Sequence, residues 1–214
     1  MNFKLNNFTE LVASTPNDFD HSVGYHDIRP FNQINDKLIA LHRYPLKNLD
    51  LADKVNIDIC LWDYHNSKID KIDTTGAWSW EQGSRLQWLN EKEIIYNKID
   101  DGKLVSCIYN IQEKKKKLLR NPVYSISKKT KRILTLNYSR LGTIWKTYGY
   151  PVINEKINYE KTPKDDGIFI CDFDNNKKLI LSIKEAVELC GLQNMKNTSF
   201  FLVHPTFSPE GDKF

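Results

Sequence analysis

One phrase recurs along the chain and limits what it can fold into: an aromatic residue, a polar turn, and then an apolar strand. The full copies are Arg29 to Ile39, Leu86 to Ile95 and Pro122 to Leu134, and a further copy opens at His204 to Phe214. Each full copy is followed by a second hairpin of apolar strands, at Val55 to Ile72, Leu104 to Leu119 and Gly167 to Leu181. Each unit therefore supplies four short antiparallel strands, the anatomy of a β-propeller blade.

The sequence predicts an all-β fold, a β-propeller of four-stranded antiparallel blades that forms a single domain over residues 1–214. We expect blades at 24–76, 77–120 and 121–183, and the start of another at 204–214. The third blade would carry an insertion at 139–166, and loops of that length are uncommon unless they bind something or are disordered. Only Ser182 to Leu192 has helical features: Ser182 and Glu185 can form a capping box, and Gly191 can end the helix.

The last copy stops at Phe214, where its apolar strand should begin. We therefore expect an incomplete propeller, about three blades plus the start of a fourth, as the N-terminal fragment of a longer one. The alternative is a small open array of β-sheets that stops here by design. The outer strand of each predicted blade is short and rich in Lys, which is typical of an edge that must not pair with another chain.

The composition excludes several classes of partner and location. A net charge of +4 is too small and too evenly spread to indicate nucleic acid or an anionic membrane as a partner. No apolar run approaches the roughly 20 residues of a membrane helix, and the N-terminus lacks the apolar core of a signal peptide. Cys60, Cys107 and Cys171 lie in apolar runs with no C-x-x-C pair, so we interpret them as buried thiols and expect a cytoplasmic location.

Polar residues stand just before the repeating aromatic positions, where the innermost strand of a blade would line the central channel. They are His26, Asp27, Arg29, Gln82, Ser84, Arg85 and His204. Such residues either contact a ligand or join neighbouring blades by hydrogen bonds and ion pairs, and the sequence leaves both interpretations open. Arg140, Tyr148 and Tyr150 lie in the predicted insertion, a suitable place for a loop that covers a substrate.

Other aromatic and basic residues have simpler interpretations. Trp88 holds the repeating core position and is expected to pack, whereas Trp78 and Trp80 could either pack or form a platform for a sugar ring. The remaining histidines, at positions 21, 42 and 65, are expected at the surface. The run Lys114 to Lys117 is expected on a solvated outer edge. The sequence contains no strand-embedded Gly-x-Ser-x-Gly, phosphate loop or Gly-rich dinucleotide fingerprint.

The segment His204 to Lys213 resembles the repeat of TolB-like propellers, which are similar to WD-repeat propellers in architecture. In that repeat the aromatic residue ends the inner strand and Ser-Pro-Asp-Gly forms the next turn, which is matched here by Ser208-Pro209-Glu210-Gly211. Proline presets the first turn dihedral and glycine supplies the positive φ. The earlier copies lack Pro-Asp-Gly in the turn. The resemblance covers about residues 24–214 through the repetition.

A narrower resemblance links three segments to uncharacterised bacterial propellers related to oligogalacturonate lyase: Gly24 to Phe31, Trp80 to Leu89 and Asn137 to Leu141. The resemblance implies cleavage of oligogalacturonides by β-elimination, with a divalent metal, typically manganese, held by histidines and a glutamine. His204 is the one histidine that matches a position suited to a ligand, and Gln82 lies outside the family's metal-binding segment. No metal ligand is firm, and a manganese site would need later blades to complete it.

Two functional hypotheses follow. In the first, the protein is a carbohydrate-directed propeller that binds or cleaves an acidic saccharide, with His26 as the catalytic base. The substrate-binding residues would then be Arg29, Gln82, Arg85, Arg140, Tyr148 and His204. In the alternative, it is a non-catalytic TolB-like module whose central face grips a peptide or a partner protein. Turnover to an unsaturated sugar would favour the first, and capture of a partner without turnover the second.

Overall fold

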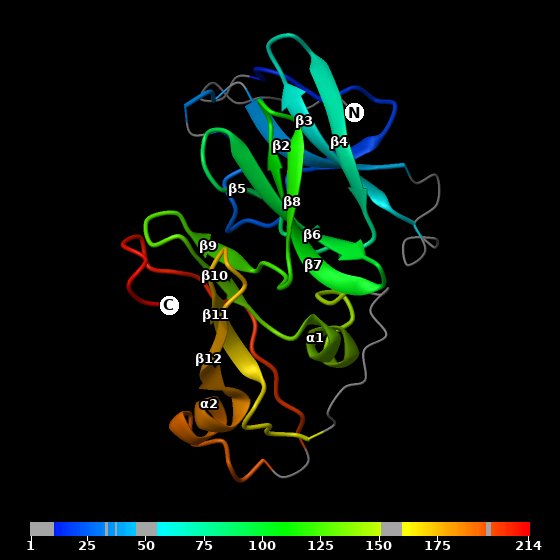
Figure 1. Cartoon of the computed structure of the whole chain (residues 1–214). Helices are drawn as coiled ribbons and strands as arrows, with labels where there is room; N and C mark the ends of the chain where they lie inside the picture. The colour runs from blue at the N-terminus through cyan, green and yellow to red at the C-terminus, as the bar shows by residue number, and fades with distance from the viewer. Residues whose placement is uncertain (1–10, 33, 37, 46–54, 151–159, 196–197) are drawn as a thin grey trace.

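The computed structural model describes residues 11–32, 34–36, 38–45, 55–150, 160–195 and 198–214. These residues form three four-stranded sheets, in the orders β1-β2-β3-β4, β5-β6-β7-β8 and β12-β11-β10-β9. Every paired strand runs antiparallel to its neighbour, and the sheets follow one another across the molecule (Figure 1). The predicted fold class, an all-β propeller of four-stranded antiparallel blades, is confirmed.

The first blade contains β1 (Asp20–Ser22), β2 (Leu38–Tyr44), β3 (Ile57–Asp63) and β4 (Lys68–Thr75). Two separate pieces of chain pair with β2: β1 lies opposite its end, and Phe31 forms an isolated bridge to Ile39 at its start. The sheet thus begins before residue 24, where we expected the blade to start. Residues 23–29 leave the sheet between the two pieces, and this excursion contributes to the site described below.

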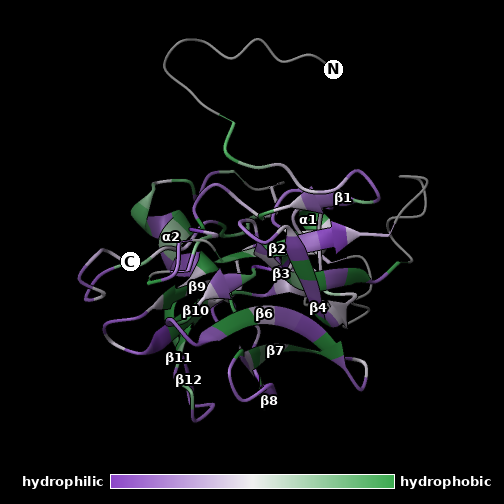
Figure 2. Cartoon of the chain, turned by 90° about the horizontal axis from the view of Figure 1, so that it is seen from above, coloured by the Kyte–Doolittle hydropathy of each residue, from purple (hydrophilic) through white to green (hydrophobic). Residues whose placement is uncertain are grey.

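The second blade contains β5 (Gln87–Trp88), β6 (Glu93–Asp100), β7 (Lys103–Asn110) and β8 (Lys115–Leu119). The third contains β9 (Ser125–Ser127), β10 (Arg132–Thr135), β11 (Gly167–Cys171) and β12 (Lys177–Ser182). Hydrophobic and hydrophilic stretches alternate along β6, whereas β4, an outer strand, is largely hydrophilic (Figure 2). This difference follows from position, because an inner strand packs between blades and an outer strand meets solvent.

Within the residues that the structure describes, two short helices accompany the sheets. The predicted helix is α2 (Ile183–Leu189): it begins at the Ser182 and Glu185 capping box and is followed by Gly191 at φ +67°. The other, α1 (Tyr138–Ile144), lies in the predicted insertion and was not expected; Asn137 caps it by accepting the Arg140 N–H. Part of the insertion, 151–159, lies outside the described residues. No described helix has both the length and the apolar character needed to cross a membrane.

The apolar core lies between the sheets. Between the first and second blades, Trp88 is buried among Ala40, Ile59 and Leu61, which confirms its packing role. Between the second and third blades, a further cluster contains Ile95, Ile108, Leu119, Val123, Ile133 and Cys171. The cysteines of the strands, Cys60, Cys107 and Cys171, are buried free thiols, as expected from their apolar surroundings.

The C-terminal segment runs beside β9 (Figure 1), where the Ser125 hydroxyl donates to the Pro205 carbonyl at 2.8 Å. Ser208 to Gly211 forms the predicted turn, closed by the Gly211 N–H donating to the Ser208 carbonyl at 2.9 Å. Gly211 has φ +75°, and a Cβ there would lie 2.1 Å from the Ser127 hydroxyl oxygen. The turn therefore requires glycine both for its backbone conformation and for its close approach to β9.

Candidate functional site

The Gln82 to Arg85 phrase forms the end of a tight turn that leads into β5. Ser79 and Gly83 exchange backbone hydrogen bonds of 3.2 and 2.8 Å, which turns the side chains of Gln82, Ser84 and Arg85 into the interior. Gly83 has φ +57°, and a Cβ there would lie 2.4 Å from His42 Cε1. Glycine is thus needed at this position because the turn presses directly on the imidazole ring.

His42 was expected at the surface, and this prediction is wrong. It lies in β2 with no exposed surface, and its Nε2 accepts the Ser84 N–H at 3.2 Å and lies 2.8 Å from the Ser84 hydroxyl. Burial lowers the pKa of His42 to about 4, so the ring is neutral at pH 7 and can act as the acceptor. His42 therefore joins the first blade to the second. Of the other histidines assigned to the surface, His65 is exposed and His21 is half-buried.

Arg85 joins all three blades. Its guanidinium donates to both Asp27 carboxylate oxygens, at 3.1 and 2.8 Å, and its Nε donates to the Tyr124 carbonyl at 2.8 Å. Its Cζ lies 4.0 Å from the centre of the Tyr124 ring. Burial disfavours the charge, but the hydrogen bonds to Asp27 outweigh it and raise the pKa of Arg85. Because Arg85 is only 1% exposed, this geometry fits the inter-blade role and not contact with a substrate.

Gln82 and Tyr124 form a buried relay beneath the surface. Gln82 Nε2 donates to the Tyr124 hydroxyl at 2.8 Å, and the same hydroxyl accepts the His204 N–H at 3.2 Å. Gln82 has no exposed surface, and its Oε1 has no hydrogen-bond partner among the described residues. The relay fixes the backbone at His204, which has φ +60°. Gln82 thus supports the neighbouring surface from below instead of contacting a substrate itself.

Above this relay, aromatic side chains from distant segments meet: His204 is exposed, Tyr25 is half-buried and Tyr148 is buried beneath them. The Tyr25 and His204 rings lie parallel at 5.5 Å, and Tyr148 meets both edge-on, with its hydroxyl 3.0 Å from that of Tyr25. Exposed His26 lies 4.1 Å from the Tyr25 ring, and Trp145 lies 4.6 Å from the Tyr148 ring. We call Tyr25, His26, Trp145, Tyr148 and His204 the ring cluster. It brings together His26, Tyr148 and His204, which we predicted as site residues from separate parts of the sequence.

Two groups of the ring cluster, Tyr148 and His204, have pKa values shifted toward the neutral form. The hydrogen bond with Tyr25, followed by burial, raises the pKa of Tyr148 to about 12, so its phenol keeps its proton. Burial lowers the pKa of His204, although the nearby Asp27 carboxylate opposes this shift. The adjacent Asp27 and Arg85 charges are paired with each other. The cluster therefore offers ring faces and neutral hydrogen-bonding groups.

The remaining predicted arginines lie elsewhere. Arg140 is buried, and its guanidinium donates to the backbone carbonyls of Phe200, Glu160 and Lys161 at 2.8 to 3.1 Å, fastening α1 to both segments. Arg29 is exposed; partial burial and then the Arg29 charge lower the pKa of Lys128, on the turn between β9 and β10. The structure does not gather Arg29, Arg85 and Arg140 around one carboxylate.

Tyr25 and Trp145 were missed as site residues in the sequence. Tyr25 stands beside His26 in the Gly24 to Phe31 phrase, so its place there was a usable signal, but Trp145 had none because α1 was not predicted.

Of the tryptophans left open between packing and a platform, Trp78 is buried and donates to the Val55 carbonyl at 2.8 Å. Trp80 is 47% exposed and stacks on Tyr44 at 5.2 Å. Tyr150 is buried, and its hydroxyl accepts from Asn97 at 2.8 Å.

The manganese site implied by the lyase resemblance is not assembled by the described residues. Within the part of the chain that the structure describes, no group of three or more His, Cys, Asp or Glu side chains could hold a metal ion. His204 lies among rings, and Gln82 is buried against Tyr124. No catalytic step through manganese is derived from these residues.

Comparisons with known proteins give only distant likenesses. No protein-family model and no curated protein matches the chain. TolB from Acinetobacter baumannii is similar at a TM-score of 0.47 and 12% identity, over 82% of this chain and 33% of that one. An uncharacterized protein from Listeria monocytogenes EGD-e is similar at a TM-score of 0.37 and 13% identity, over 81% and 56%. The chain thus spans about a third of the first and just over half of the second, and neither likeness bears on function.

Proposed function

We propose that the protein is a carbohydrate-directed propeller whose ring cluster binds a saccharide. The observation that carries the proposal is the packing of half-buried Tyr25 and exposed His204 on buried Tyr148, with exposed His26 and Trp145 beside them. Sugar rings present C–H faces that pack on aromatic rings, and their hydroxyls exchange hydrogen bonds with neutral phenols and imidazoles.

The ring cluster supports recognition of sugar rings more directly than recognition of a carboxylate. Arg85 and Arg140 are engaged with Asp27 and with backbone carbonyls, and the pKa shifts of Tyr148 and His204 favour their neutral forms. We therefore expect an oligogalacturonate and the corresponding neutral oligogalactose to bind with similar affinity. Cleavage of the acidic saccharide, with exposed His26 as the base, is a separate part of the proposal and needs its own readout.

Binding can be measured by titrating the protein with galacturonate trimer and with galactose trimer while following tryptophan fluorescence. Trp145 serves as the reporter because it is 44% exposed and contacts the Tyr148 ring. Replacing Tyr25→Ala or His204→Ala should weaken binding by about tenfold, as expected when one packed ring contact is removed. His65→Ala is the matched control, since His65 is also exposed but lies in the turn between β3 and β4.

The outcomes of this titration separate the hypotheses. Saturable binding that is lost in His204→Ala and kept in His65→Ala supports the saccharide site. New ultraviolet absorbance from an unsaturated sugar, tested with and without added manganese, would extend the proposal to lyase activity. No saturable change with either saccharide at millimolar concentration rejects the proposal and leaves the protein-binding alternative. That alternative is favoured by the exposed indole rings of Trp80 and Trp145, because Trp is enriched at protein interfaces.

A further inference from the structure

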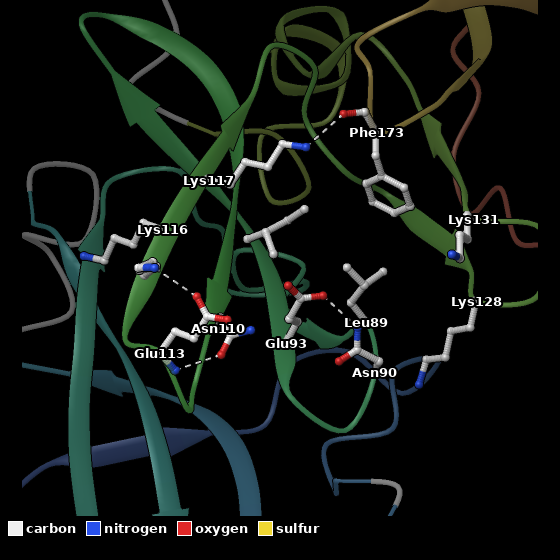
Figure 3. A pocket seen from close by; sticks show the side chains of 12 residues that line it. Leu89, Asn90, Glu93, Asn110, Glu113, Lys116, Lys117, Lys128, Lys131 and Phe173 are labelled. Carbon is white, nitrogen blue, oxygen red and sulfur yellow. Dashed lines mark hydrogen bonds and ion pairs between the residues drawn. The ribbon is translucent and has the colours of Figure 1, made fainter.

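A groove of about 660 Å³ opens between the second and third blades, away from the ring cluster. Its apolar floor contains Leu89, Ile108 and Phe173. Lysines line it from both sides: Lys115 to Lys117 come from β8, and Lys128 and Lys131 from the turn between β9 and β10 (Figure 3). This volume lies within the range typical of ligand sites.

The groove lies at the opposite end of the second blade from the ring cluster. Glu93 and Asn110, which form the paired start of β6 and end of β7, line the groove. Further along β6, Asn97 does not line the groove, and its backbone N–H donates to the Ser84 carbonyl at 2.8 Å, next to the turn that supports the ring cluster. The two surfaces can therefore be altered independently.

Several of these lysines carry charges that the protein does not neutralise. Lys115 pairs with Glu113 at 3.2 Å and Lys116 with Asp73 at 3.0 Å. Within the described part of the chain, Lys117, Lys128 and Lys131 form no ion pair with a carboxylate. Glu93 and Glu113 also line the groove, so its five lysines exceed its carboxylates. The remaining positive charge over an apolar floor favours an anionic ligand that also carries an apolar group.

The arrangement of the charges indicates the shape of the ligand. They are distributed on two walls instead of converging on one point, and every cation that lines the groove is a lysine, a point charge without the bidentate geometry of arginine. Several separated carboxylates therefore match the groove better than a single phosphate. In addition, β8 is the last strand of its sheet, so its outer backbone edge pairs with no strand of the described residues, and an extended segment can pair there.

We propose that this groove binds an extended acidic segment of a partner protein, with an aliphatic or aromatic side chain seated between its carboxylates on the floor formed by Leu89, Ile108 and Phe173. Charge complementarity identifies the occupant: acidic side chains meet the lysines of both walls, and the apolar side chain covers the floor. The proposal is independent of the saccharide site, since it uses none of the residues of the ring cluster.

The test uses a fluorescein-labelled peptide of alternating Glu and Leu, and fluorescence anisotropy with the whole chain. Matched peptides replace each Glu by Gln or each Leu by Ser, and a labelled oligothymidylate of similar length tests for simple attraction to any polyanion. We expect the Glu-Leu peptide to bind most tightly and to weaken as salt rises, because the contacts are exposed charge pairs. Equal binding of the Gln peptide or the Ser peptide, or tighter binding of the oligothymidylate, overturns the proposal.

Protein variants locate the binding. The double variant Lys128→Glu with Lys131→Glu reverses charge on one wall and should weaken the Glu-Leu peptide about tenfold, because two attractive contacts become repulsive. Lys103→Glu is the control, since Lys103 is an exposed lysine of β7 that does not line the groove. All the changed side chains are exposed, so folding should be preserved. Equal weakening in the double variant and the control contradicts the assignment to this groove.

Discussion

The boundary between the first and second blades is closed, whereas the boundary between the second and third opens into a groove. At the closed boundary, Trp88 Nε1 donates to the Pro30 carbonyl at 2.7 Å. There Asp73 accepts from the Tyr96 hydroxyl at 2.6 Å and pairs with Lys98 and Lys116 at 2.7 and 3.0 Å. At the other boundary, Tyr124 and its partners close the end near the ring cluster, and lysines line the opposite end.

The difference lies in the side chains, because both boundaries are formed by sheets with the same anatomy. The first blade supplies an acid, Asp73, to the lysines that face it from the second blade. The turn between β9 and β10 supplies lysines at 128, 129 and 131 instead. Among the residues that the structure describes, only Lys129 of these forms an ion pair, with Glu210. A blade boundary is thus closed where its lysines pair with a carboxylate, and it forms a positively charged groove where they do not.

The largest expected effect is at the core of the closed boundary. Trp88→Ala should lower the free energy of unfolding by about 3–5 kcal/mol, because a buried indole and its hydrogen bond are lost. Phe173→Ala, at the open boundary, should cost only about 1 kcal/mol, since this ring is partly exposed in the groove. Urea denaturation of both variants measures the difference, and equal losses would show that the two boundaries are equally closed.

A smaller effect is expected from His42, which holds the closed boundary together as a neutral ring. Its pKa falls from 6.5 to about 4 on folding, so unfolding takes up a proton between these values. The contribution of neutral His42 to the free energy of unfolding is complete above pH 6.5. As the pH falls toward 4, this free energy decreases by about 2–3 kcal/mol.

His42→Gln tests this prediction by urea denaturation at several pH values. This variant should be less stable at pH 7 but should lose most of the dependence on pH between 6.5 and 4. His65→Gln, an exposed control, should retain that dependence, and both variants keep His21 and His204, whose pKa values burial also lowers. If the free energy of unfolding of His42→Gln depended on pH as strongly as that of the unchanged protein, the His42 ring would not be buried at this boundary.

The smallest of these effects concerns Asp73. Burial alone would raise its pKa, but hydrogen bonds from Lys98, Tyr96 and Lys116 outweigh burial and lower the pKa from 3.8 to about 2. Its contribution is therefore complete above pH 3.8 and is lost as the pH falls toward 2. Asp73→Asn should cost about 1–2 kcal/mol at pH 7 and less at pH 2. Denaturant midpoints at the two pH values measure this, and Asp70→Asn, an exposed neighbour on β4, should change stability little.

Much of the fold could be predicted from the sequence because its causes are local. Alternating apolar strands separated by polar turns, repeated along the chain, predicted each four-stranded blade. The capping box of Ser182 and Glu185 marked the start of α2, and Ser208 to Gly211 marked a turn whose glycine has positive φ. By contrast, α1 was missed because its short sequence lies where a long loop, the insertion at 139–166, was expected.

The candidate site was only partly predictable, since its chemistry depends on partners far away in the chain. The sequence by itself determined which polar and aromatic residues stand before each blade, and it selected His26, Tyr148 and His204. Only the tertiary structure decided that Arg85 pairs with Asp27, that Arg140 holds backbone carbonyls and that His42 is buried under Gly83. The physical reason is that a side chain's charge and hydrogen bonds are shared with whatever packs against it, and in a propeller that partner comes from another blade.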